Sequence, residues 1–224
     1  MEDKYTKDII NCIKSSLSKY ETNVFDELCL LFCSYFEKSC NNIMELKKRT
    51  QKSKGTCFEI FCFLFLEQKG YKCWMINDLP INIRTELHLD KQDVGIDIIA
   101  FKNDKYYPVQ CKFRNPTKDC KGRQVHRVTW RELSTFFSLC NRTGGQKGWT
   151  KHIIMTNADY CCFKGKKNSK DYTIAKKSFQ NIDRKLWMDI SSFKTISQQP
   201  LIIPSNEVIR NLRQNFLSSL SKNQ

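Results

Sequence analysis

The stretches Gly95-Ile96-Asp97-Ile98-Ile99-Ala100 and Tyr106-Tyr107-Pro108-Val109-Gln110-Cys111-Lys112 decide how this chain folds. Asp97 interrupts a run of β-branched apolar residues, which is the pattern of a buried strand. Residues 101–105 between the two stretches are polar and turn-prone. We therefore expect two neighbouring strands joined as a hairpin.

The second strand separates its side chains onto two faces. Because side chains alternate along a strand, Gln110 and Lys112 should share one face. Val109 and Cys111 should point the other way, into the sheet. With Asp97 on the neighbouring strand, the pattern brings together an acid, an amide oxygen and a lysine. Metal-dependent hydrolysis of a phosphodiester requires groups of this kind.

A second candidate acid lies in residues 57–66, Cys-Phe-Glu-Ile-Phe-Cys-Phe-Leu-Phe-Leu, where Glu59 is the only charged side chain. A helix this apolar is mostly buried, so a lone carboxylate in it needs a cation nearby. A structural salt bridge and an exposed helix edge are the alternatives for Glu59.

Each of the other three candidates also has a structural alternative. Asp97 could be a strand-end acid that accepts hydrogen bonds from backbone amides. Gln110 could be a polar sheet residue, and Lys112 could be a surface lysine on an edge strand.

Charge points to a polyanionic partner. The chain has 224 residues, a net charge of +15 and a pI near 9.3, which favours nucleic acid as the partner. Residues 102–131 hold nine lysines and arginines against two acids, and residues 163–185 hold eight against two. The alternative is a solvated surface that keeps the protein in solution. The expected nucleic-acid contacts are Lys102, Arg114, Lys121, Arg123, Arg127, Arg131, Lys164, Lys166 and Lys167.

Composition excludes several other classes of protein. No apolar run is long enough to span a bilayer, and the N-terminus lacks the order of a signal peptide, so we expect no membrane and an intracellular, soluble protein of the cytoplasm or nucleus. The twelve cysteines include no Cys-x-x-Cys pair and should be reduced core residues.

Periodicity and turn signals predict the elements along the chain. Residues 1–50 are expected to be helical, with a break at 21–23. Further helices are predicted over 56–68, 125–140, 171–181 and 207–220, and further strands over 71–76, 151–156 and 185–190, while 81–89 reads as an insertion or irregular strand and 115–124 as a loop. The order predicts an α/β fold, a mixed sheet flanked by helices. We divide it into a helical extension (1–50), a core (51–195) and a C-terminal helical segment (196–224).

The pattern Asp-x12-Gln-x-Lys, after Asp93-Val-Gly-Ile-Asp97 and a helix with a lone Glu, resembles the PD-(D/E)xK nuclease superfamily. It is most similar to the Mrr-like branch of restriction endonucleases, in which Gln often replaces the second acid. The resemblance runs from about residue 54 to about residue 190. It implies a restriction-endonuclease-like core.

The resemblance also implies an activity and a site. It implies a DNA endonuclease that uses Mg²⁺, with Mn²⁺ as a substitute. The ligands would be Glu59, Asp97, Gln110 and the backbone carbonyl of Cys111, and Asp93 could add one more. Lys112 would orient or deprotonate the attacking water, or stabilise the phosphate.

Partners follow from the same expectation: duplex or branched DNA, a homodimer for double-strand cleavage, and a protein partner at the N-terminal helices. Two rival functions remain open. One is a catalytically inactive nucleic-acid-binding module of the same fold, since Gln110 carries no charge. The other is an interaction protein with a vestigial core.

Overall fold

The computed structural model of this chain describes residues 2–19, 21–34, 43–91, 95–119, 121–163 and 170–193, and for residues 2–3 and 43–52 only the backbone. Residues 1–193 form one compact unit. The helix predicted over 207–220, and the whole segment 196–224, lie outside the described residues.

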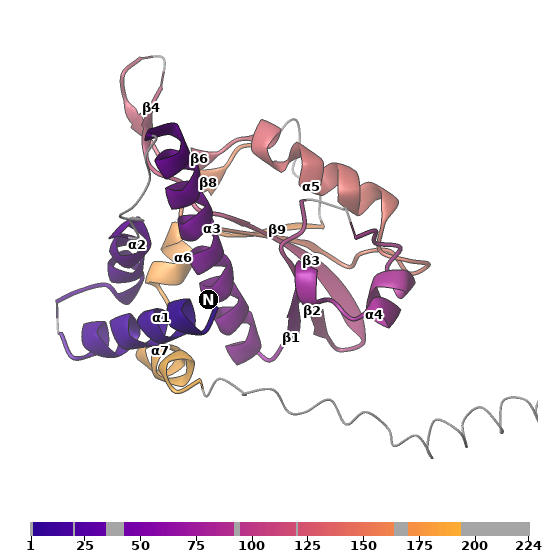
Figure 1. The fold of residues 1–224 in the computed structure, drawn as a ribbon, viewed down its shortest axis with the longest axis horizontal. Helices are drawn as coiled ribbons and strands as arrows, with labels where there is room; N and C mark the ends of the chain where they lie inside the picture. The colour runs from indigo at the N-terminus through magenta and orange to yellow at the C-terminus, as the bar shows by residue number, and fades with distance from the viewer. Residues whose placement is uncertain are drawn as a thin grey trace, which may run out of the picture. The chain divides into compact units, whose positions relative to one another are not determined.

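Seven α-helices, one 3-10 turn and nine strands are described (Figure 1). The helices are α1 (Glu2–Leu17), α2 (Val24–Ser34), α3 (Ile43–Gln68), α4 (Ile81–Glu86), α5 (Trp130–Arg142), α6 (Lys176–Gln180) and α7 (Arg184–Ser191), and η1 spans Ile76–Asp78. The strands are β1 (Lys72–Met75), β2 (Ile98–Lys102), β3 (Lys105–Lys112), β4 (Thr117–Lys118), β5 (Gln124–Val125), β6 (Arg127–Val128), β7 (His152–Thr156), β8 (Tyr160–Cys161) and β9 (Asp171–Ile174).

The central sheet has five strands in the order β1-β2-β3-β7-β9. The pairs β1–β2 and β2–β3 are antiparallel, and the pairs β3–β7 and β7–β9 are parallel. The predicted hairpin of the two decisive stretches is thus confirmed, with Ile98 opposite Val109. Two small two-stranded sheets, β4–β5 and β6–β8, lie outside it.

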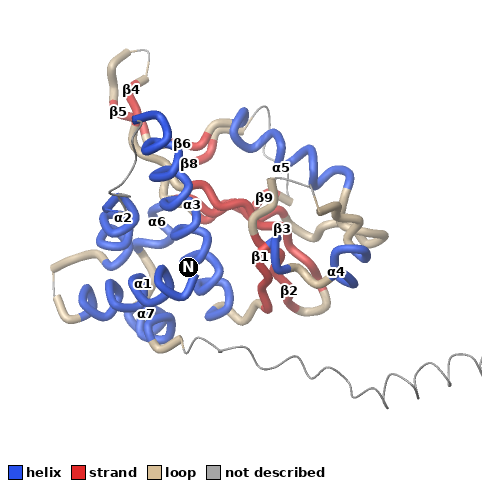
Figure 2. The backbone as a smooth tube through the Cα atoms, viewed as in Figure 1, coloured by secondary structure: helices blue, strands red, loops and turns tan. Residues whose placement is uncertain are grey.

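Helices cover both faces of the sheet, so the predicted α/β fold is confirmed (Figure 2). Ile98 and Ala100 belong to the core cluster beneath α1, α2, α3, α6 and α7, whereas Ile99 belongs to the cluster beneath α4 and α5. On β7 the same alternation holds, because Ile153 faces the first cluster and Ile154 the second. The sheet is therefore buried on two sides.

The N-terminal helices are part of the first core cluster. Ile9, Ile13, Phe25 and Phe32 are fully buried there together with α3. Asn23 Oδ1 accepts a hydrogen bond of 3.0 Å from the backbone N–H of Phe25, so the predicted break caps α2. None of the helices within the described ranges is long and apolar enough to cross a membrane.

Several predicted boundaries were wrong at the N-terminal side of the core. The helix predicted over 56–68 begins at Ile43, because the polar residues before 56 continue the same helix. The segment 81–89 contains helix α4, which follows Pro80, a residue with a backbone angle suited to a helix start. The loop predicted over 115–124 contains the strand pair β4–β5.

Other errors lie nearer the C-terminus, where tertiary pairing overrides local pattern. The helix predicted over 125–140 begins at Trp130, because β5 and β6 occupy the residues before it and Thr129 and Glu132 form a capping box. The helix over 171–181 is strand β9 paired with β7, followed by the short α6. The strand over 185–190 is helix α7, whose start Asp183 caps by accepting the N–H of Leu186 at 2.8 Å.

We expect Phe25→Ala to lower the free energy of unfolding by about 3–5 kcal/mol, because it leaves a cavity in the core. The Phe25 ring is fully buried and lies 4.7 Å from Phe179 and 5.7 Å from Phe61, centroid to centroid. The control is Leu30→Ala on the same helix, since Leu30 is 65% exposed and should change stability by less than about 0.5 kcal/mol. Urea unfolding measures both. Equal effects of the two variants would show that α2 does not belong to the core.

Candidate active site

Asp97 lies directly before β2 and is held by three backbone hydrogen bonds. Its Oδ2 accepts the backbone N–H of Cys111 at 2.6 Å, its own N–H donates to the carbonyl of Val109 at 2.9 Å, and its carbonyl accepts the N–H of Ile76 at 2.9 Å. The alternative of an acid bonded to a backbone amide is therefore part of the arrangement. The carboxylate is thereby fixed against the C-terminal half of β3.

Gly95 places Asp97 by a close approach to helix α5. Its φ is +115°, which favours glycine, and a Cβ there would lie 3.1 Å from the backbone nitrogen of Phe136. A side chain at residue 95 would push α5 away from the strand start. The backbone that Gly95 approaches is thus that of α5.

Gln110 faces Asp97 from the neighbouring strand. Its side chain is 2% exposed, and its Nε2 donates a short hydrogen bond to Asp97 Oδ2 and a long one, 3.4 Å, to the carbonyl of Cys111. In this arrangement the amide offsets part of the charge of Asp97 with its nitrogen. Coordination of a cation through Oε1 requires the amide to be turned around, a change of orientation that the side chain's shape allows.

Glu59 on α3 reaches the same place from above the sheet. Burial raises the pKa of its carboxyl to about 7, the charge of Asp97 adds to this rise, and the charge of Lys112 opposes it. The pKa of Asp97 is also raised by burial, while the Cys111 amide, Lys112 and Gln110 act in the opposite direction. Two partly buried carboxylates and one ammonium therefore interact across α3, β2 and β3.

The residues fit a hard divalent cation. Two carboxylates that resist ionisation beside one lysine lack positive charge, and a divalent ion would supply it. In the part of the chain that the structure describes, no group of three or more His, Cys, Asp or Glu side chains could hold a metal. The remaining ligands would come from an amide, a backbone carbonyl or water, and Mg²⁺ characteristically retains several waters. The buried thiols of Cys62 and Cys111, which hydrogen-bond each other, lie beneath the carboxylates.

The end of β3 is fixed by two residues that the sequence left without a role, Thr156 and Asn157 at the end of β7. Thr156 Oγ1 donates to the carbonyl of Lys112 at 2.6 Å. Asn157 accepts the N–H of Arg114 at 2.7 Å and donates to its carbonyl at 2.8 Å. Both side chains are at most 4% exposed. A Thr-Asn pair at the end of the strand predicted over 151–156 was the available signal.

The predicted DNA-contact residues fall into different places. Arg114 is ion-paired with Glu132 close to the end of β3. Lys102 lies at the other end of β2 from Asp97, where its Nζ donates to the carbonyl of Lys69 at 2.6 Å. The exposed residues beyond the end of β3 are Lys121 and Arg123 near the β4–β5 turn, Arg127 on β6 and Arg131 in the first turn of α5. Asp93, Lys164, Lys166 and Lys167 lie outside the described residues.

The tryptophan and histidine side chains between residues 126 and 152 have structural partners. Trp130 stacks on Phe137 at 4.9 Å, and Trp149 is 3% exposed. His152 Nδ1 lies 2.9 Å from Asp171 Oδ1. His126 Nε2 lies 2.9 Å from the carbonyl of Arg114 and helps to fix the chain after β3.

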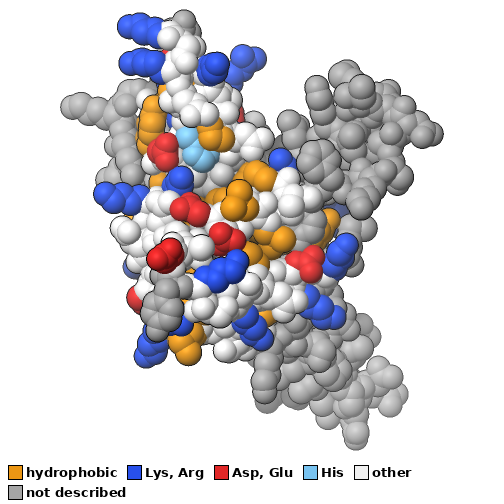
Figure 3. Space-filling model, turned by 90° about the vertical axis from the view of Figure 1, so that its left-hand side faces the viewer, with side chains coloured by type: hydrophobic (Ala, Val, Ile, Leu, Met, Phe, Trp, Pro, Cys, Tyr) orange, Lys and Arg blue, Asp and Glu red, His pale blue; other side chains and the backbone are white. Residues whose placement is uncertain are grey.

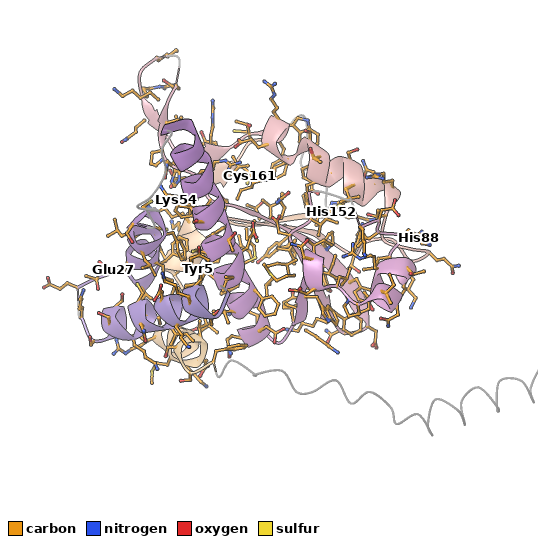
Figure 4. The ribbon with its side chains drawn as sticks, viewed as in Figure 1. Tyr5, Glu27, Lys54, His88, His152 and Cys161 are labelled. Atoms are coloured by element: carbon orange, nitrogen blue, oxygen red, sulfur yellow. The ribbon has the colours of Figure 1, made fainter. Side chains whose placement is uncertain are left out.

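A pocket of about 840 Å³ lies away from these carboxylates. It is lined by the β2–β3 turn and the glycine-rich loop 144–148, at the opposite end of β2 from Asp97. His88 lines this pocket, and Figure 4 shows it on the opposite side of the molecule from Lys54, which lies on α3 near Glu59. Figure 3 shows another face, where acidic side chains lie near the middle and Lys and Arg side chains surround a projection at the top.

Comparison with known families gave a match. A family model described as a restriction endonuclease, of the Mrr catalytic type, matches residues 65–184, which is more than half of the chain. The match contains Asp97, Gln110 and Lys112 but begins after Glu59 on α3, whose place in the site rests on the structure. Comparisons with curated proteins and with solved structures gave no match.

In metal-free buffer with a chelator, we expect the protein to lose stability as the pH rises from about 4.5 to about 7. Folded Glu59 keeps its proton up to a pKa of about 7, whereas an unfolded glutamate releases it near 4.5. The folded state therefore binds more protons in this window, so the free energy of unfolding falls as pH rises, by up to about 3 kcal/mol.

Glu59→Gln should remove most of that fall, and Glu27→Gln on α2 serves as the control that keeps it. Urea unfolding at several pH values measures the effect. The same pH dependence in the parent protein and in Glu59→Gln would contradict the burial of Glu59 beside Asp97.

Proposed function

Since this chain belongs to the Mrr-type restriction endonuclease family, we propose that it is a Mg²⁺-dependent DNA endonuclease that hydrolyses phosphodiester bonds. The observation that supports the proposal most is the mutual influence of Glu59, Asp97 and Lys112, which lie on three different elements. Carboxylates facing one another in a partly buried place are costly without a cation, and this cost is typical of functional sites.

The proposed ligands are the carboxylates of Asp97 and Glu59, the amide oxygen of Gln110 and the backbone carbonyl of Cys111. A bound Mg²⁺ or Mn²⁺ would supply charge stabilisation at the phosphate and a more acidic water. Asp97 is suited to ligation because the Cys111 amide and the strand pairing fix its carboxylate.

Lys112 has the role of holding the attacking water or the phosphate. Its backbone is fixed by Thr156 at 2.6 Å, so the ammonium starts from a defined position beside both carboxylates. A fixed donor aimed at developing negative charge needs little reorganisation during the reaction. Duplex or branched DNA is the proposed substrate. A homodimer, and a protein partner at the N-terminal helices, are further predictions.

A second candidate function has one observation in its favour. Gln110 stands where many relatives of this superfamily would have an acid, and its amide donates its nitrogen to Asp97. A catalytically inactive module that binds nucleic acid could keep this arrangement without a metal.

The test is cleavage of supercoiled, linear and branched DNA with Mg²⁺, Mn²⁺ or EDTA. We expect the parent protein to nick or cut DNA only with the metal, and Asp97→Ala or Lys112→Ala to lower the rate by about 10²-fold or more. The control is Lys105→Ala, a change of an exposed lysine at the other end of β3, which should keep the parent rate. If parent and variants bind DNA equally and none cuts it with any metal, the inactive module is the correct account.

A further inference from the structure

The hairpin that follows β3 is an exposed basic arm with almost no apolar support. Strands β4 and β5 pair through Thr117 with Val125 and Lys118 with Gln124. Among the described residues from 117 to 124, only Asp119 is not exposed, and none belongs to either core cluster. An isolated two-stranded hairpin is only marginally stable in water, so this one needs another source of order.

Asp119 provides that order near the turn. Its carboxylate accepts the backbone N–H groups of Lys121 and Arg123 and the side-chain Nε of Arg123, each at 2.9 Å. Its own N–H donates to the carbonyl of Arg123 at 2.9 Å. The side chain of Asp119 is 9% exposed, whereas that of Arg123 is 71% exposed. The one acid of the arm thus forms hydrogen bonds within it, and the basic side chains are directed to solvent.

The composition of the arm is suited to contacts with DNA phosphates and to binding in a groove of the duplex. Residues 117–127 contain Lys118, Lys121, Arg123 and Arg127 against the one acid Asp119, a net charge of +3. Residues 115–128 contain no Phe, Tyr or Trp. Proteins that bind single strands without base reading rely on aromatic stacking, so this arm is suited to a duplex. The major groove of DNA, about 12 Å wide, admits a two-stranded β-ribbon.

The base of the arm is attached to the proposed active site. Thr117 follows Lys112 by five residues, and Arg114 between them is clamped by Asn157 and His126. On the return, β6 pairs with β8 before α5 begins. Figure 1 shows the arm projecting from the body of the molecule at β4, and the projection at the top of Figure 3 carries Lys and Arg side chains.

We propose that residues 117–119 and 121–125 form an arm that binds a groove of duplex DNA next to the bond that is cut. The inference rests on the proposed function for the position of the cut, while the binding itself is measured without cleavage. Lys118 and Lys121 contact phosphates, and Asp119 keeps the ribbon in the shape that enters the groove.

The first test measures binding to a 30-base-pair DNA duplex in EDTA at 50 to 200 mM salt. Lys118→Ala/Lys121→Ala should make the negative slope of log affinity against log salt shallower by about 2. The affinity that this variant loses over the salt range should therefore be about tenfold smaller than the loss in the parent. Lys105→Ala/Lys147→Ala, two exposed lysines at the other end of the sheet, should leave the slope unchanged. An unchanged slope in Lys118→Ala/Lys121→Ala, or an equal change of slope in both double variants, would contradict DNA binding by the arm.

A second variant separates shape from charge. Asp119→Ala raises the net charge of the arm by one unit, so charge alone predicts tighter binding. The proposal predicts binding at least about threefold weaker, because the turn loses the acceptor of three hydrogen bonds. Tighter binding by Asp119→Ala would contradict binding through the shape of the ribbon. Equal affinity of the parent for the DNA duplex and for a 30-nucleotide single strand or an RNA duplex would contradict it as well.

Cleavage at saturating protein and low salt distinguishes the two proposals. If the parent cuts DNA and the salt slope of the lysine variant is unchanged, the arm is wrong and the nuclease stands. If the parent cuts no DNA but the slope falls as expected, the nuclease is wrong and the arm stands.

Discussion

The burial of the Glu59 and Asp97 carboxyls at one site is the constraint on which the rest of this molecule depends. Both carboxyls have raised pKa values because they are partly buried. The positive charge of Lys112 acts in the opposite direction on both pKa values. Such a pair stays together only if its backbones are held by forces larger than the cost of burying the two carboxyls. Strand pairing holds Asp97, and helix packing holds Glu59.

Packing of phenylalanine side chains holds the helix that carries Glu59. Phe58 and Phe61, on either side of Glu59 in sequence, are fully buried against α2 and α6. Phe58 also packs at 5.7 Å against Phe113, the residue after Lys112. The helix that carries Glu59 is thereby tied to the strand that carries Lys112. The N-terminal helices lie before the matched family region, yet they complete the packing that orients α3.

The sequence predicts the strand hairpin and the helices that flank the sheet, because each depends on a strong local pattern. The choice of the four candidate residues also depends on local pattern. An alternating strand fixes where Gln110 and Lys112 point, and a lone Glu among Phe and Leu indicates a buried charge. The errors arise where another part of the chain decides. Residues 171–174 were predicted as helix but pair with β7. The start of α7 is different, because Asp183 caps it through a local hydrogen bond that the strand prediction did not include. The clamp by Asn157 joins residues 43 positions apart, a distance that local pattern does not report.

The most direct test of the central claim is a calorimetric titration of Mn²⁺ into the intact protein, beside Asp97→Asn, Gln110→Glu and Glu86→Gln. The account predicts one site in the parent, a loss of that site in Asp97→Asn, and tighter binding in Gln110→Glu, because a third carboxylate adds charge to the ligand set. Glu86→Gln, an exposed change near the distant pocket, should bind as the parent does. The same heat of binding in the parent and in Asp97→Asn would contradict a metal site at these carboxylates.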